Sequence, residues 1–139
     1  MRTFSLVVLL GCLGSTVVAD DAAKVLKKLQ GKWEIERIEE GGNVISLDQV
    51  NDKQFTLKGN QLLPSKNPKD PGYLKLSPEK KPAWIDLTDK DKKVMKGIYR
   101  INKDRWEICL SDPGSPRPKK FKSTQDGKVH LLVLRRKEK

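Results

Sequence analysis

Beyond Gly31, the apolar residues of this 139-residue chain alternate with polar ones in short runs, and clusters of Gly, Pro, Asn and Asp separate the runs. Trp33 and Ile35 illustrate this spacing, as do Phe55 and Leu57. A period of two is typical of strands with one buried face, and short turn clusters favour antiparallel neighbours. The pattern therefore predicts a mainly β structure.

Eight short strands are predicted, a number that favours a small antiparallel β-barrel or sandwich. They are Lys32 to Glu39, Gln54 to Lys58, Gln61 to Leu63, Tyr73 to Leu76, Ala83 to Leu87, Val94 to Ile101, Trp106 to Leu110, and Val129 to Arg135. Apolar spacing of three and four residues predicts one amphipathic helix over residues 21–30, ended by Gly31. Because Leu131 to Leu134 is apolar on both faces, we expect this helix to cover the outer side of the last strand.

Residues 1–19 have the layout of a signal peptide. Arg2 precedes an apolar run that is shorter than the ~20 residues needed to span a membrane, and small residues lead to a cleavage position before Asp20. We therefore expect an exported single domain at 20–139, in the periplasm, the cell envelope or outside the cell. A second interpretation is that Leu9 to Cys12 is a lipobox, so that acylated Cys12 anchors the protein to a membrane.

The charge of the chain is uneven. Residues 20–139 carry 28 Lys and Arg against 18 Asp and Glu, and residues 61–139 hold 21 of these basic side chains and 10 of the acidic ones. About 120 residues suffice for one core, which excludes a multi-domain enzyme. The densest basic cluster consists of Arg117, Lys119, Lys120 and Lys122. Such a cluster is either a solvated face or a surface for an anionic lipid, a polysaccharide or an acidic protein, whereas nucleic acid is a poor partner for an exported chain.

The chain offers little for catalysis. After cleavage Cys109 is the single cysteine, so no internal disulfide forms, and alternation places it on the face opposite Trp106 and Ile108. His130 is the single histidine, and a Cys109–His130 dyad has no identifiable third residue to orient it. The carboxylates from Asp86 to Asp91 do not have calcium-loop spacing. We expect no enzyme activity, no cofactor and no metal.

Gly31-Lys32-Trp33 resembles the G-x-W signature that opens lipocalin-like barrels. Later segments resemble, in the same order, a family of exported lipocalin-like domains common in planctomycete bacteria: Lys81 to Thr88, Lys96 to Tyr99, Ile108 to Leu110, Pro116 to Pro118 with Phe121, and Leu131 to Arg136. The likeness extends over about residues 26–137. It implies a lipocalin-like barrel and an exported location, and because the function of that family is not established, it does not indicate a function.

By this resemblance, the barrel is closed at one end by Gly31 and Trp33, and Arg135 or Arg136 packs over the Trp33 ring. Such a cation–π contact stabilises a fold by about 0.5–2 kcal/mol and does not indicate which ligand, if any, the barrel binds. The chain is shorter than typical lipocalins and lacks their disulfide, which argues against a roomy cavity.

Two functions follow as hypotheses. The preferred one is non-enzymatic binding of a small apolar or amphipathic ligand at the open end of the barrel, with Phe55, Trp84, Tyr99 and Trp106 facing the ligand. The alternative is an interaction module of the cell envelope, in which the barrel is filled and the basic cluster binds an anionic partner. A cavity of ~300 Å³ or more inside the barrel favours the first hypothesis, and a filled barrel favours the second.

Overall fold

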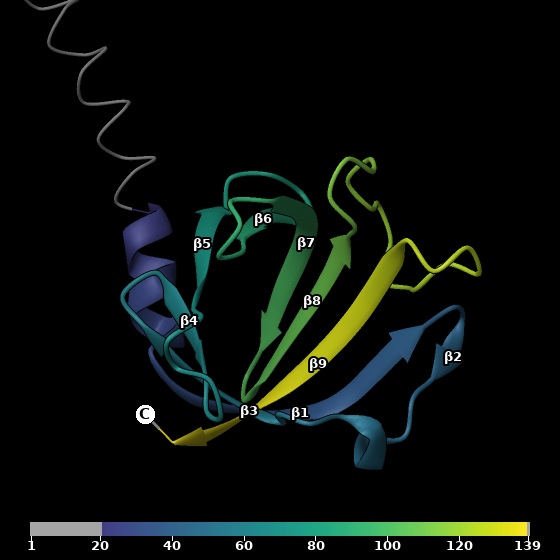
Figure 1. Cartoon of the computed structure of the whole chain (residues 1–139). Helices are drawn as coiled ribbons and strands as arrows, with labels where there is room; N and C mark the ends of the chain where they lie inside the picture. Colours follow the sequence, from purple (N-terminus) through teal and green to yellow (C-terminus); the bar gives the residue numbers. More distant parts are fainter. Residues whose placement is uncertain (1–20, 139) are drawn as a thin grey trace, which may run out of the picture.

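The computed structural model describes residues 21–138, and Figure 1 shows a β-barrel with a short helix beside it. The predicted signal peptide, Cys12 and the cleavage position before Asp20 lie outside the described residues. Within residues 21–138, no helix is long and apolar enough to cross a membrane.

Eight antiparallel strands form the barrel, which confirms the predicted fold class (Figure 1). They are β1 (Gly31–Glu40), β3 (Gln54–Lys58), β4 (Gln61–Pro64), β5 (Gly72–Ser77), β6 (Ala83–Thr88), β7 (Val94–Asn102), β8 (Arg105–Ser111) and β9 (Val129–Glu138). Each strand pairs with the next in the chain, and β1 pairs with β9 to close the barrel. The two-residue strand β2 (Asn43–Val44) and the 3-10 helix η1 (Leu47–Gln49) lie between β1 and β3 and were not predicted.

The barrel interior is filled by side chains from all eight strands. The buried cluster consists of Leu29, Trp33, Ile35, Ile38, Leu57, Leu62, Leu74, Leu76, Ile85, Tyr99, Trp106, Ile108, Leu110 and Leu134. Ile45, Leu47 and Val50, from the connection between β1 and β3, pack against this cluster as well. Burial of this apolar surface is the main stabilising contribution in a domain that holds one free cysteine among its described residues.

The helix spans residues 21–29, one residue less than predicted at its C-terminal end. Gly31 follows with φ of 117°, a conformation that favours glycine, and the chain turns directly into β1. Phe121 and Val129, and not the helix, pack against the outward Leu131 of the last strand, so the prediction that the helix covers this side is wrong. The apolar face of the helix instead delivers Leu29 to the interior cluster.

The outer faces of β7, β8 and β9 are covered by the β8–β9 loop, residues 112–128. Ile98, Cys109 and Leu131 are register neighbours on these three strands and form a second buried cluster, against which Phe121 and Val129 pack. The apolar residues of β9 on both faces are thus explained by the barrel interior on one side and this loop on the other.

Candidate functional site

The closed end of the barrel contains the contact implied by the lipocalin resemblance. The guanidinium carbon of Arg136 lies 4.4 Å from the centroid of the Trp33 ring. Arg136 also donates hydrogen bonds to the carbonyl oxygens of Lys28 and Gln30, and the Trp33 indole donates to that of Leu29 at 2.8 Å. Three carbonyls that the helix end leaves free are satisfied in this way. Arg135, the other candidate, is exposed and does not take this place.

The four residues predicted to face a ligand do not share one surface. Phe55 is the register partner of Trp33, and Tyr99 and Trp106 belong to the interior cluster, so these three point inward. Trp84 is the register partner of the outward Ile98 and is 37% exposed. Its prediction as a ligand-facing residue inside the barrel is therefore wrong.

The inward aromatic side chains pack against one another. Trp33 and Trp106 meet edge to face with ring centroids 5.3 Å apart, and both are fully buried. Burial, and to a lesser extent the charge of Glu79, raises the pKa of Tyr99 to about 12. The Trp106 indole nitrogen is buried without a hydrogen-bond partner.

On the outer face, Arg117 holds the β8–β9 loop against β6 and β7. Its guanidinium donates to the carbonyl oxygen of Gly97 at 2.7 Å and to that of Ile85 at 3.3 Å, and it pairs with the Asp86 carboxylate at 2.9 Å. The guanidinium carbon also lies 4.2 Å from the centroid of the Trp84 ring. Arg117 was predicted as part of an anionic-partner surface, but its charge is largely engaged by these contacts, and its side chain is only 17% exposed.

The same loop seals Cys109. The thiol is fully buried and lies 3.3 Å from the carbonyl oxygen of Lys120 and 3.6 Å from that of Lys122. Burial raises the pKa of Cys109, and Glu39 acts in the same direction, while the hydrogen bond to Lys122 opposes them. A nucleophilic cysteine needs the opposite environment.

The Cys109–His130 dyad does not exist in this fold. His130 is the register partner of the inward Leu110, whereas Cys109 faces outward. His130 instead lies 2.7 Å from Asp112 and 3.4 Å from Glu40, measured between ring nitrogen and carboxylate oxygen. Among residues 21–138, no three His, Cys, Asp or Glu side chains are placed to hold a metal ion.

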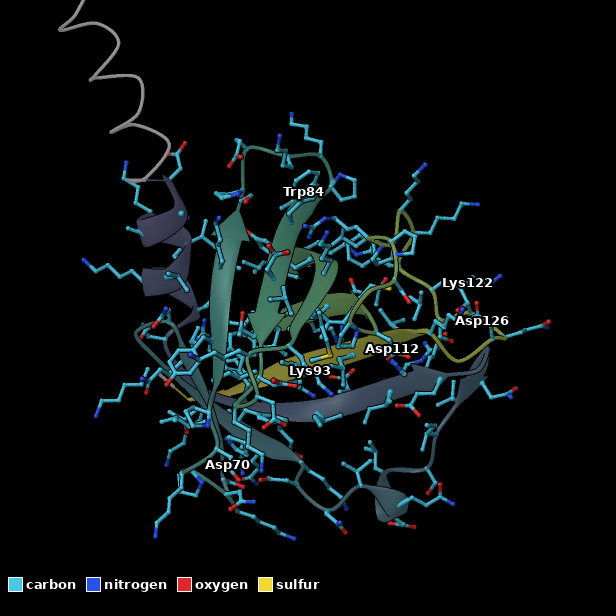
Figure 2. All side chains as sticks on the ribbon, turned by 45° about the horizontal axis from the view of Figure 1, so that its top comes forward. Asp70, Trp84, Lys93, Asp112, Lys122 and Asp126 are labelled. Carbon is cyan, nitrogen blue, oxygen red and sulfur yellow. The ribbon has the colours of Figure 1, made fainter. Side chains whose placement is uncertain are left out.

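A hollow of about 450 Å³ opens on the outer surface beside Trp84, a volume within the range of small-molecule sites. Figure 2 shows Trp84 at the top of the barrel, on the same side of the molecule as the β8–β9 loop and far from Asp70. The hollow is lined by Lys81, Pro82, Trp84, Lys96, Ile98, Arg117, Pro118 and Lys119. No family model, curated protein or solved structure matches this chain.

Most of the positive charges in this hollow are not paired with a carboxylate. Lys81, Lys96 and Lys119 are exposed, and none of them forms a salt bridge with another described residue. Asp86 is the register partner of Lys96, but its carboxylate pairs with Arg117. None of the described residues that line the hollow is acidic.

A second outer hollow, of about 690 Å³, lies on the other part of the loop. It shares Arg117, Pro118 and Lys119 with the first hollow and adds Lys120 and Lys122. We call the exposed or partly exposed cations of both hollows, together with the adjacent Lys80, the basic face: Lys80, Lys81, Lys96, Arg117, Lys119, Lys120 and Lys122.

Sequence reasoning identified the loop cations of this face but missed Lys80, Lys81 and Lys96. The sequence pattern could have indicated one of them, Lys96. Alternation puts Lys96 on the same side of its strand as Ile98, opposite Gly97 and Tyr99. No signal placed the loop beside these strands, because that depends on the contacts of Arg117.

Proposed function

We propose that this protein is an exported, non-enzymatic interaction module, in which the filled barrel serves as a rigid scaffold and the basic face binds an anionic partner at the cell envelope. The observation that carries the proposal is the gathering of six exposed lysines of the basic face, from the β5–β6 turn, β7 and the β8–β9 loop, in and beside two outer hollows. Clustered cations of one sign attract polyanions and accelerate their association.

The attachment of the loop supports the proposal further. Lys119, Lys120 and Lys122 follow directly after Arg117, whose guanidinium is fixed to the sheet, and the backbone carbonyls of Lys120 and Lys122 lie against the buried Cys109 thiol. The lysine side chains project into solvent from a backbone that is held in place. Such preorganisation reduces the entropy that a partner's binding must overcome.

The test is binding to a panel of immobilised anionic materials: dextran sulfate, polygalacturonate and phosphatidylglycerol vesicles, with dextran and phosphatidylcholine vesicles as neutral counterparts. We expect the protein to bind at least one anionic member and to lose about tenfold or more in affinity between 50 and 200 mM salt, because several counterions are released. Binding to none of them, or binding that salt leaves unchanged, would contradict the proposal.

A matched pair of variants locates the interaction. The variant K119Q/K120Q/K122Q removes three charges from the basic face, and K24Q/K27Q/K58Q removes three exposed charges near the helix end of the barrel. The first variant should bind more weakly than the second at equal salt. Equal weakening in both would mean that net charge, and not this face, is responsible.

Binding of a small apolar ligand inside the barrel is a second candidate, favoured by one observation. The buried Trp106 indole nitrogen lacks an acceptor, which a carbonyl or carboxylate oxygen of a ligand could supply. Trp106 lies against Trp33 near the closed end, however, so a ligand must displace packed side chains to reach it. A blue or red shift of the buried tryptophan fluorescence on titration with fatty acids would support this candidate, and an unchanged spectrum would remove it.

A further inference from the structure

The shape and lining of the hollow beside Trp84 indicate which class of anion the basic face binds. This inference rests on the function proposed above. We propose that the partner is a linear acidic polysaccharide, one carboxylated or sulfated sugar unit of which sits in the hollow lined by Lys81, Lys96 and Lys119.

The first argument is shape. Lys81, Lys96 and Lys119 come from three separate segments and line a concave space of about 450 Å³. A single sugar unit with its acidic group enters such a space and meets the three cations together. A bilayer presents its headgroups in a plane, so it contacts the rim of such a hollow more than its floor.

The second argument is the nature of the apolar surface. Proteins that bind at a membrane interface bury protruding apolar side chains among the lipids. Trp84 does not protrude in this way, because Arg117 and Lys80 place their cationic groups 4.2 and 4.7 Å from its ring centroid. The part of the indole that remains exposed lies beside Pro82 and Pro118. Together they form an apolar surface that does not protrude and that the C–H groups of a sugar ring can contact.

The third argument is continuity. The two outer hollows share Arg117, Pro118 and Lys119, so they adjoin, and basic residues line both of them. A polymer with a charge on each repeat can occupy both hollows at once. Binding through two adjacent subsites gains affinity from the high effective concentration of the second unit.

Trp84 provides a local reporter for the test. Of the three tryptophans, Trp33 and Trp106 are fully buried, and Trp84 is 37% exposed. Acrylamide, a neutral quencher, therefore quenches mainly Trp84 in the folded protein. Polygalacturonate or dextran sulfate should protect Trp84 from acrylamide, and neutral dextran should not. The variant W84F should abolish the protected component of the fluorescence.

The hollow itself is tested with K81Q/K96Q, compared with K24Q/K27Q, which removes the same charge from the helix. We expect the first variant to weaken polysaccharide binding by about fivefold or more and the second to have a smaller effect. All four lysines are exposed, so both variants should fold normally.

The outcomes separate this inference from the proposed function. Salt-sensitive binding to phosphatidylglycerol vesicles without binding to either polysaccharide would overturn the inference and leave the proposed function standing, with a membrane as partner. Polysaccharide binding that K81Q/K96Q does not weaken, or that leaves Trp84 open to acrylamide, would overturn the proposed site. Binding to neither vesicles nor polysaccharides would overturn both.

Discussion

Arg117 and Trp84 lie in different segments of the chain, and the guanidinium carbon of the one is 4.2 Å from the ring centroid of the other. This contact joins the longest loop to the outer face of β6. The same guanidinium donates hydrogen bonds to two carbonyl oxygens of the sheet and forms an ion pair with one carboxylate, so a single side chain fixes the loop that carries three of the basic-face lysines.

Replacement of this arginine should loosen the loop without unfolding the barrel. Arg117→Lys keeps the charge but loses the planar fork that reaches Gly97, Ile85 and Asp86 together, and we expect the free energy of unfolding to fall by about 1–2 kcal/mol. Because the loop seals Cys109, labelling of this thiol by iodoacetamide should accelerate by about tenfold or more if the opening free energy falls by ~1.4 kcal/mol.

Two controls accompany that measurement. In the wild-type protein at neutral pH, Cys109 should label slowly, because burial raises its pKa and blocks access, and it should label fast in urea. Lys119→Gln changes an exposed neighbour and should leave the labelling rate unchanged. Fast labelling of the wild-type protein would mean that the loop does not shield the thiol.

The two adjacent arginines near the C-terminus should differ sharply in their contribution to stability. Arg136→Met removes the contact with Trp33 and two hydrogen bonds to the helix end, and should lower the free energy of unfolding by about 2–3 kcal/mol. Arg135→Met alters an exposed side chain and should change it by less than about 0.5 kcal/mol. Urea denaturation measures both, and equal losses would contradict the assigned role of Arg136.

Tyr99 should make the protein sensitive to strongly alkaline solution. Burial raises its pKa from the ordinary value of 10 to about 12, so folding favours the neutral phenol. This contribution to stability is complete below pH 10 and is lost as the pH rises from 10 to 12. The contribution is at most about 2–3 kcal/mol. Urea denaturation at several pH values should show a steeper loss above pH 10 in the wild-type protein than in Tyr99→Phe. Identical slopes would show that other groups cause the loss.

Gly97 should tolerate no side chain, although its position is in the middle of a strand. A Cβ there would collide with the backbone oxygen of Cys109 and lie 2.7 Å from Leu110 Cδ2, and the strand cannot move without disturbing the carbonyl that Arg117 binds. We expect Gly97→Ala to cost about 2 kcal/mol or more. Gly72→Ala is the matched comparison, because its closest contact, at 2.7 Å, is the flexible end of Leu87, and it should cost less. Thermal unfolding of the two variants would rank them, and a larger loss for Gly72→Ala would contradict this account.

The barrel could be predicted because alternation is a local property. Trp33 with Ile35, and Trp106 with Ile108, point inward as their spacing indicates. The same rule placed Cys109 outward correctly. Applied to Trp84, the same rule groups this residue with Asp86 on the outer side of β6, which is where the structure places it.

The basic face could be predicted only in part. Its loop cations are dense in the sequence, whereas Lys81 and Lys96 become part of the face only because the loop folds over β6 and β7. That fold-over depends on contacts between residues 20 and 32 positions apart, namely Arg117 with Gly97 and with Ile85. Alternation along a strand carries no information about such contacts.

The pairing of β4 with β5 is the shortest in the barrel wall, with two register pairs, Gln61 with Tyr73 and Leu62 with Gly72, and one further hydrogen bond from Leu74 to Asn60. The seam between β1 and β9, in contrast, has seven register pairs. The wall should therefore open first at β4–β5, and the amide hydrogens there should exchange with deuterium well before those of β8. A destabilising substitution elsewhere in the barrel would therefore expose the edges of β4 and β5 before those of the other strands. An exposed strand edge can pair with a strand of another molecule.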